Sequence, residues 1–242
     1  MKDSTKPKNP IFVITGREVM SYFLSPIAYI VAGLFVGASG FLFFNTFFLA
    51  NRAELRNFFS LLPILFSFFI PALTMKMFSE EKKSTSIETL LTLPVTVTQV
   101  VVGKFLGSFI CGLSLLAPSL FYALTCFIFG SPDAGPMIAS YLGSFLLLAS
   151  FCSIGLFASS TTKNQIVAFF IAFSICIVLT LLSNFAIFLP AILVRPVAFL
   201  SASNHFESIS RGIIDSRDIV YFASLTFIFI LLTVKSIKGG QE

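Results

Sequence analysis

The amino-acid sequence predicts an all-α membrane protein with six transmembrane helices and three shorter helical segments outside them. Hydrophobic residues make up 56% of the 242 residues and charged residues only 11%, whereas a soluble domain carries about 25% charged residues. The mean hydropathy is +0.95. The apolar stretches are close to the length of about 20 residues that a helix needs to cross a bilayer. They are too long and too continuously apolar for the alternating segments of roughly 10 residues that are typical of a membrane β-barrel.

Six apolar stretches, none of which contains Lys, Arg, Asp or Glu, are the predicted spans. They cover about 27–48, 58–75, 105–129, 138–159, 166–189 and 219–234, within a single domain of residues 1–242. Because a backbone in lipid must satisfy its own hydrogen bonds, each stretch is expected to be a helix. The charged residues collect between the spans, so we expect the membrane part to have no charged relay of its own.

The basic residues divide unevenly between the two sides of the predicted bundle. One side holds eleven of the sixteen, and the other holds Arg52, Arg56, Arg195, Arg211 and Arg217. Since cytoplasmic loops carry the excess of Lys and Arg, both termini are predicted to be cytoplasmic. The first span is too long for the core of a signal peptide, so we expect it to remain as an anchor in the inner membrane.

The segment before the first span has the pattern of a helix lying in the membrane interface. Thr15 and Glu18 have the spacing of a capping box, in which each side chain bonds the backbone amide of the other. Apolar residues offer a surface beside Arg17 and Glu18, as in an interfacial amphipathic helix. Ser25-Pro26 is expected to break this helix, because proline suits the first turn of the next one.

The longest predicted cytoplasmic loop joins the second and third spans and contains a short amphipathic helix. Thr85 and Glu88 again have capping-box spacing. Ile87, Leu90 and Leu91 recur at helical spacing and form one apolar face. An isolated helix of about two turns is marginal in water, so it needs a surface to pack on. That surface is either another protein or the membrane, on which a solvated helix would lie.

Four stretches of the chain follow the pattern of a known family. They are residues 78–94 with Gly103-Lys104 after them, 25–29, 154–160 with 164–169, and 205–218. The first contains an acidic pair, a basic residue, a Glu-x-Leu-Leu core and a proline. Thr85-Ser86-Ile87-Glu88 stands where the family usually has Gly-Thr-Leu-Glu. Together the stretches resemble the ABC-2 type transporter permeases, and among these the gliding-motility-associated (GldF-like) permease subunits.

The resemblance implies a permease half that pairs with a second permease, identical or paralogous, and with two cytoplasmic ABC ATPase subunits. The helix in the 79–94 loop would be a coupling helix seated on the ATPase, and ATP and Mg²⁺ would bind in that partner. The residues that the resemblance assigns to ATPase coupling are Glu80, Glu81, Lys82, Glu88, Leu90 and Leu91. Arg17 and Glu18 would brace them. Export is the expected direction, because most members of this class export.

The segment before the last span is expected to be helical and extracytoplasmic. Asn204, with Glu207 three residues later, predicts a helix start. Gly212 predicts its end, and Asp215 or Ser216 a cap of the last span. The resemblance implies short re-entrant helices that close the outer end of the pathway. The charged residues of the segment, expected to pair with one another or to contact an extracytoplasmic partner, are Glu207, Arg211, Asp215, Arg217 and Asp218. His205, in the same segment, is expected to have a structural or interfacial role.

Several functions lack the residues that they need. There is no Gly-x-x-x-x-Gly-Lys-[Ser/Thr] phosphate loop, so the chain is not expected to be an ATPase itself. A single histidine argues against a metal site and against a catalytic constellation. The distribution of the basic residues indicates membrane topology instead of nucleic-acid binding. The cysteines fall within apolar stretches and are expected to be small hydrophobes; they are Cys111, Cys126, Cys152 and Cys176.

Two alternatives to a transporter subunit follow from the same observations. A membrane scaffold of an ATPase-driven envelope or gliding complex would move no solute. An ion-coupled carrier is disfavoured because the spans lack the carboxylates that such carriers use. A transport assay that shows substrate flux requiring ATP would distinguish a transporter subunit from both alternatives.

Overall fold

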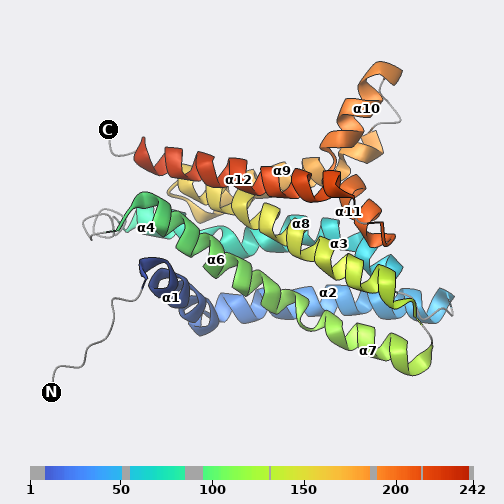
Figure 1. Cartoon of the computed structure of the whole chain (residues 1–242). Helices are drawn as coiled ribbons and strands as arrows, with labels where there is room; N and C mark the ends of the chain where they lie inside the picture. Colours follow the sequence, from blue (N-terminus) through green and yellow to red (C-terminus); the bar gives the residue numbers. More distant parts are fainter. Residues whose placement is uncertain are drawn as a thin grey trace.

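The computed structural model describes residues 9–50, 55–84, 95–130, 132–185, 190–213 and 215–239. Within these ranges the secondary structure is helical, with no strand. The helices are α1 (Pro10–Leu24), α2 (Pro26–Ala50), α3 (Arg56–Thr74), α4 (Lys76–Lys83), α6 (Val97–Leu116), α7 (Ser119–Phe129), α8 (Ala134–Thr161), α9 (Gln165–Phe185), α10 (Ala191–Leu200), α11 (Ala202–Ser210) and α12 (Ser216–Lys238). The long helices run side by side in one bundle (Figure 1). The predicted all-α membrane fold is confirmed.

Six helical stretches of the described chain are long and apolar enough to cross a membrane. They are Pro26–Phe48, Arg56–Lys83, Val97–Phe129, Ala134–Thr161, Gln165–Phe185 and Ser216–Lys238. The third begins at Val97, earlier than the sequence predicts, and so contains Lys104. The sequence prediction began the apolar span only after the charged Lys104. The helix nevertheless continues through Lys104, because its ammonium group is hydrogen-bonded inside the protein and needs no water. The predicted start of this span at residue 105 was therefore too late.

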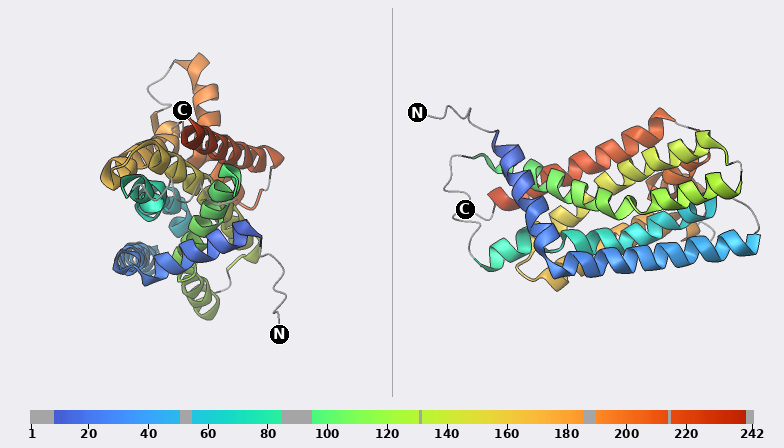
Figure 2. Two further views of the ribbon diagram at one scale, coloured as in Figure 1. Left: turned by 90° about the vertical axis from the view of Figure 1, so that its left-hand side faces the viewer. Right: turned by 90° about the horizontal axis from the view of Figure 1, so that it is seen from below.

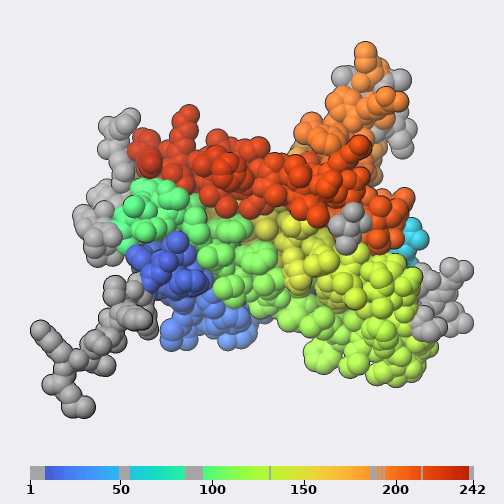
Figure 3. Space-filling view, viewed as in Figure 1, coloured from blue at the N-terminus to red at the C-terminus, as the bar shows by residue number. Residues whose placement is uncertain are grey.

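The start of α1 and the end of α12 lie at the same end of the bundle (Figure 1). We call this end, which contains α1, α4, the start of α6 and the end of α12, the α4 end. The opposite end, which contains α7, α10 and α11, is the α11 end. In the space-filling view α10 stands away from the bundle at the α11 end, while α1 covers α6 at the α4 end (Figure 3).

α1 crosses the α4 end at a steep angle to the long helices (Figure 2). Asn9 caps its first turn, so the predicted capping box at Thr15 was wrong, and Thr15 is buried in the middle of the helix. Ser25 caps the end of α1 and Pro26 begins α2, as predicted. Large apolar side chains such as Leu24 remain exposed on α1. Such a surface is typical of a helix in the membrane interface.

α8 is the central helix of the bundle. It packs against α3, α6, α9, α11 and α12, and 72% of its most apolar stretch is buried. Glycines allow this close approach: a Cβ at Gly155 would lie 2.8 Å from Cβ of Thr74, and a Cβ at Gly112 would lie 2.6 Å from a methyl group of Leu148. Small residues at such crossings let membrane helices pack tightly.

The cysteines occupy the bundle as small buried hydrophobes. All four are free thiols and buried; they are Cys111, Cys126, Cys152 and Cys176. This agrees with the prediction from their apolar surroundings. Pro118 separates α6 from α7, because a proline inside a helix removes a backbone hydrogen bond.

Candidate functional site

α4 is fixed to the bundle by a hydroxyl group from α8. Its first turn has no side-chain cap of its own. Instead, Oγ of Ser159 accepts hydrogen bonds from the backbone amides of Phe78 at 2.8 Å and Ser79 at 3.1 Å. The same hydroxyl donates to the carbonyl of Met75 at 3.1 Å. Since the first amides of a helix lack partners within it, Ser159 supplies from another helix what an N-cap residue normally supplies.

The other end of α4 is bonded to the last turn of α8. The ammonium group of Lys82 donates to the carbonyl of Ser160, and Oγ of Ser236 on α12 donates to the same carbonyl at 3.2 Å. A cation is favoured at a helix C-terminus, where the last carbonyls lack partners. Both ends of α4 are therefore attached to the central helix.

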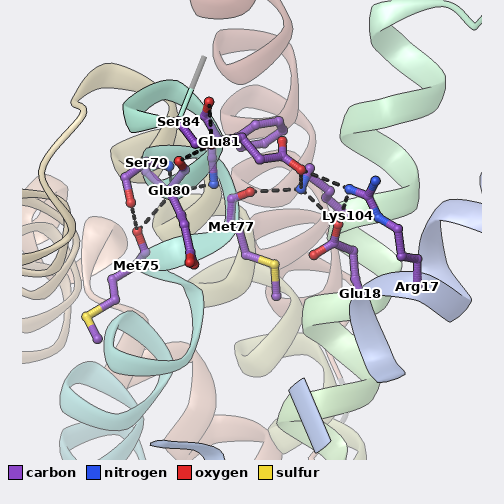
Figure 4. Close-up of polar contacts among 11 residues, drawn as sticks. Arg17, Glu18, Met75, Met77, Ser79, Glu80, Glu81, Ser84 and Lys104 are labelled. Atoms are coloured by element: carbon purple, nitrogen blue, oxygen red, sulfur yellow. Dashed lines mark hydrogen bonds and ion pairs between the residues drawn. The ribbon is translucent and has the colours of Figure 1, made fainter. Parts of the chain in front are cut away.

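Lys104 of α6 is the centre of a buried charged cluster that joins three helices (Figure 4). Its side chain is 1% exposed. Its ammonium nitrogen lies 2.9 Å from Oε1 of Glu18 on α1, 2.9 Å from Oε1 of Glu81 on α4, and 2.8 Å from the carbonyl of Met77. An ammonium group has three hydrogens, so each one has an acceptor. The Phe78 ring lies 5.1 Å from the nitrogen, within the range of a cation–π contact.

Arg17 closes this cluster from the solvent side. Its NH2 nitrogen lies 2.9 Å from Oε1 of Glu81 and 3.1 Å from Oε1 of Glu18, and its side chain is about half exposed. Partial burial acts to lower the pKa of Arg17, but the two carboxylates outweigh it, so the pKa is raised above its ordinary value. Arg17 and Lys104 thus each contact Oε1 of Glu18 on α1 and Oε1 of Glu81 on α4, and so join the two helices.

The glycine before Lys104 allows α1 to lie directly against α6. A Cβ at Gly103 would come 2.9 Å from Cβ of Ile14, which is closer than real side chains approach. The Thr15 hydroxyl donates to the Gly103 carbonyl at 3.0 Å. The Gly-Lys pair of the sequence therefore combines a close helix crossing with a buried cation.

A pocket of about 260 Å³ opens between α1 and α4 beside the cluster, and its lining includes Lys76, Glu80 and Tyr22. Within the described part of the chain, the Tyr22 hydroxyl and Oε2 of Glu81 are buried without a hydrogen-bond partner. Burial, together with nearby Cys111, raises the pKa of Tyr22 to about 12. The volume is below the range of roughly 300–1,000 Å³ typical of small-molecule sites, and it suits a few water molecules.

The structure brings together some of the predicted coupling residues and leaves others undescribed. Glu81 and Lys82 on α4 contact α6 and α8, and Glu80 lines the pocket. The residues predicted for the coupling helix that lie outside the described ranges are Glu88, Leu90 and Leu91. Lys104 and Ser159 were not predicted as site residues. The Gly-Lys pair was a signal for Lys104, whereas one serine among many on α8 gave none.

At the α11 end the predicted charged segment divides into separate contacts. Oδ1 of Asp218 lies 2.6 Å from Nδ1 of His205, and both side chains are buried. Glu207 and Arg211 pair with each other at 2.6 Å on the exposed surface. The side chain of Asp215 accepts a hydrogen bond from the backbone amide of Arg217 and so caps the start of α12, as predicted. The predicted pairing is observed for Glu207 with Arg211. The pair of His205 with Asp218 was not predicted.

The predicted helix start at Asn204 was wrong. α11 begins at Ala202, and Asn204 lies inside it, where its amide group donates to the carbonyl of Ala198. The side chain therefore bonds the preceding helix instead of its own first turn. Gly212, with φ of +88°, follows α11 in a left-handed conformation that suits glycine, and the predicted end is confirmed. Among the described residues no group of three His, Cys, Asp or Glu side chains is placed to hold a metal ion.

These features define a multi-pass helical membrane protein with a buried charged cluster at one end and two short helices, α10 and α11, at the other. A family model described as ABC-2 family transporter protein matches residues 40–210, which is more than half of the chain. The chain belongs to this family and is a permease subunit of an ABC transporter. Membership implies that it associates with an ATPase subunit. A search of curated proteins found no match.

Proposed function

We propose that this permease subunit belongs to an exporter and that its ATPase partner binds at the α4 end through the 79–94 segment. α4 ends at Lys83 and α6 begins at Val97, and both of these helix ends lie at the α4 end of the bundle (Figure 1). Of the six predicted coupling residues, three lie on α4 and three fall in the interval between α4 and α6. This placement is the observation on which the proposal rests.

The contacts of α4 supply a route for force from this segment into the bundle. A displacement of α4 acts on α8 through Ser159 and Lys82, and on α1 and α6 through Glu81 and Lys104. Buried and fully bonded polar groups resist independent movement, because each broken bond leaves an unsatisfied group. ATP-driven movement of the segment would therefore shift α4 together with its neighbours.

A second permease copy is part of the proposal. α2 lies at the edge of the bundle, and only 22% of its most apolar stretch is buried within the chain. A Cβ at Gly33 or Gly37 would have nothing within 4 Å. This small-residue face is open to lipid or to another helix, and small residues at such spacing allow membrane helices to associate.

We further propose that the α4 end faces the cytoplasm of a bacterial-type inner membrane, as the excess of Lys and Arg on that side indicates. Both termini would then be cytoplasmic. The GldF-like resemblance makes a gliding-associated complex the first setting to consider for the transporter.

Co-purification with candidate ATPase subunits in detergent tests the proposal. The Glu88→Arg variant and the Leu90→Asp/Leu91→Asp double variant should lose a stoichiometric ATPase while still eluting as folded protein. Glu207→Arg is the matched control, because it makes the same change in charge on the exposed surface at the α11 end. The proposal fails if the segment variants retain the ATPase, or if Glu207→Arg loses it equally.

A further inference from the structure

The last turn of α10 presents three consecutive backbone carbonyls to side chains from the next two helices. Asn204 Nδ2, His205 Nε2 and Tyr221 Oη lie 3.1, 2.8 and 2.7 Å from the carbonyl oxygens of residues 198–200, in that order. The last carbonyls of a helix have no partner within it. α10 is therefore fastened to α11 and α12 by side-chain donors at its C-terminus.

The His205 ring lies between two hydrogen-bond acceptors. Nδ1 is 2.6 Å from the carboxylate oxygen Oδ1 of Asp218, and Nε2 is 2.8 Å from the carbonyl of Phe199. The ring is 7% exposed and stacks on Tyr221 with 4.1 Å between centroids. A neutral imidazole has only one N–H, so it can donate to only one of these acceptors. Both contacts are satisfied only when the site holds a second proton.

The surroundings favour that proton on the ring. Nδ1 of His205 and Oδ1 of Asp218 are 2.6 Å apart, so a proton on the ring lies in direct contact with the carboxylate. The C-terminus of α10 also favours a cation. Oδ2 of Asp218 is buried and has no hydrogen-bond partner among the described residues. A neutral ring would leave the Asp218 carboxylate without a compensating charge in direct contact.

No other charged side chain of the described residues is in contact with this pair. The charged groups on α10, α11 and the start of α12 are all at least partly exposed; they are Arg195, Glu207, Arg211, Asp215 and Arg217. Arg56 and Asp133 lie exposed near the starts of α3 and α8. The Tyr141 hydroxyl of α8 bonds Ser119 instead. Asp218 and Tyr221 are thus the titratable groups that face the ring.

We propose that His205 and Asp218 form a proton-binding site that fastens the α10–α11 hairpin to α12. Loss of the proton leaves one ring nitrogen facing an acceptor with no hydrogen between them. Either the contact with Asp218 on α12 or the contact with the end of α10 must then break. Raising the pH on this side of the membrane therefore loosens α10, which already stands away from the bundle (Figure 3).

The chain has a single histidine, so its protonation can be read directly. The full chain, labelled with ¹⁵N-histidine and reconstituted in lipid nanodiscs, is titrated over about pH 5 to 8, where imidazoles ordinarily change charge. In the wild type both ring nitrogens should be protonated at the acidic end of this range, and one should lose its proton as the pH rises. In Asp218→Asn the ring should become neutral at a lower pH than in the wild type. A wild-type ring that is neutral throughout the range would overturn the proposal.

The position of α10 is measured in the same particles with spin labels at Ile192→Cys and Val220→Cys, which are exposed sites on α10 and α12. The wild-type distance distribution should broaden as the pH rises, and His205→Gln should remove this pH dependence. Glu207→Gln, on the exposed surface, is the control and should behave as the wild type does. An unchanged wild-type distribution, or a pH dependence that persists in His205→Gln, would reject the site. Size-exclusion profiles verify that each variant is folded.

Discussion

Replacing Lys104 by methionine tests whether the buried cluster holds α1 and α4 on α6. Methionine keeps the length of the apolar stem but removes the charge. Oε1 of Glu18 and Oε1 of Glu81 each lie 2.9 Å from the ammonium nitrogen, so they are at most about 5.8 Å apart. Without the cation their repulsion is about 3 kcal/mol at an effective dielectric constant near 20. Removing one member of a buried pair ordinarily costs about 3–5 kcal/mol.

The expected loss is near the lower limit of that range. Arg17 still bonds both carboxylates, and the two side chains are 11% and 16% exposed. We therefore expect the free energy of unfolding of Lys104→Met to fall by about 3 kcal/mol. Denaturation of the detergent-solubilised protein measures this change, and proteolysis of α1 reports its local release. The ATPase should also be lost from the complex if α4 is displaced.

Lys163→Met is the matched control, because Lys163 is exposed near the same end of the bundle. It should leave stability and α1 unchanged. Adding Glu81→Gln to Lys104→Met should restore part of the lost stability, since one of the unpaired charges is removed. If Lys104→Met were as stable as Lys163→Met, the cluster would not hold these helices together and the reasoning would be refuted.

Three further substitutions test individual contacts. Ser159→Ala should lower the stability of the protein by about 1–3 kcal/mol, because two buried amides of α4 lose their acceptor. Thermal unfolding measures this loss, and the control Ser153→Ala, on the same helix, should lower stability less. Gly155→Ala should cost about 1–3 kcal/mol by forcing α8 away from Thr74, and an unchanged melting temperature would contradict that crossing. Tyr22→Phe should be neutral or slightly stabilising, since the hydroxyl is buried without a partner among the described residues; a clear loss of stability would show that the hydroxyl is bonded.

Sequence periodicity was a good guide to the fold but a poor guide to buried charge. The number of spans followed from apolar length, which depends only on local composition. The rule that excluded charges from spans failed at Lys104, because its three acceptors come from α1 and α4. The Gly103-Lys104 pair marks the position, but nothing local names the residues of α1 and α4 that desolvate Lys104 and bond it. The same limit applies to Asn204, whose partner lies on the preceding helix.

The sequence by itself determined that this is an all-α membrane protein with six spans, a separate N-terminal helix that ends at Ser25-Pro26, and a cap at Asp215. These features depend on hydropathy and on residues near one another in the chain, so they can be read locally. Only the tertiary structure decided that Ser159 caps α4, that Lys104 joins α1 to α4, and that His205 sits between Asp218 and the end of α10. Each of these contacts depends on which helix faces meet in the bundle. The packing of helices that are distant in the sequence determines which faces meet.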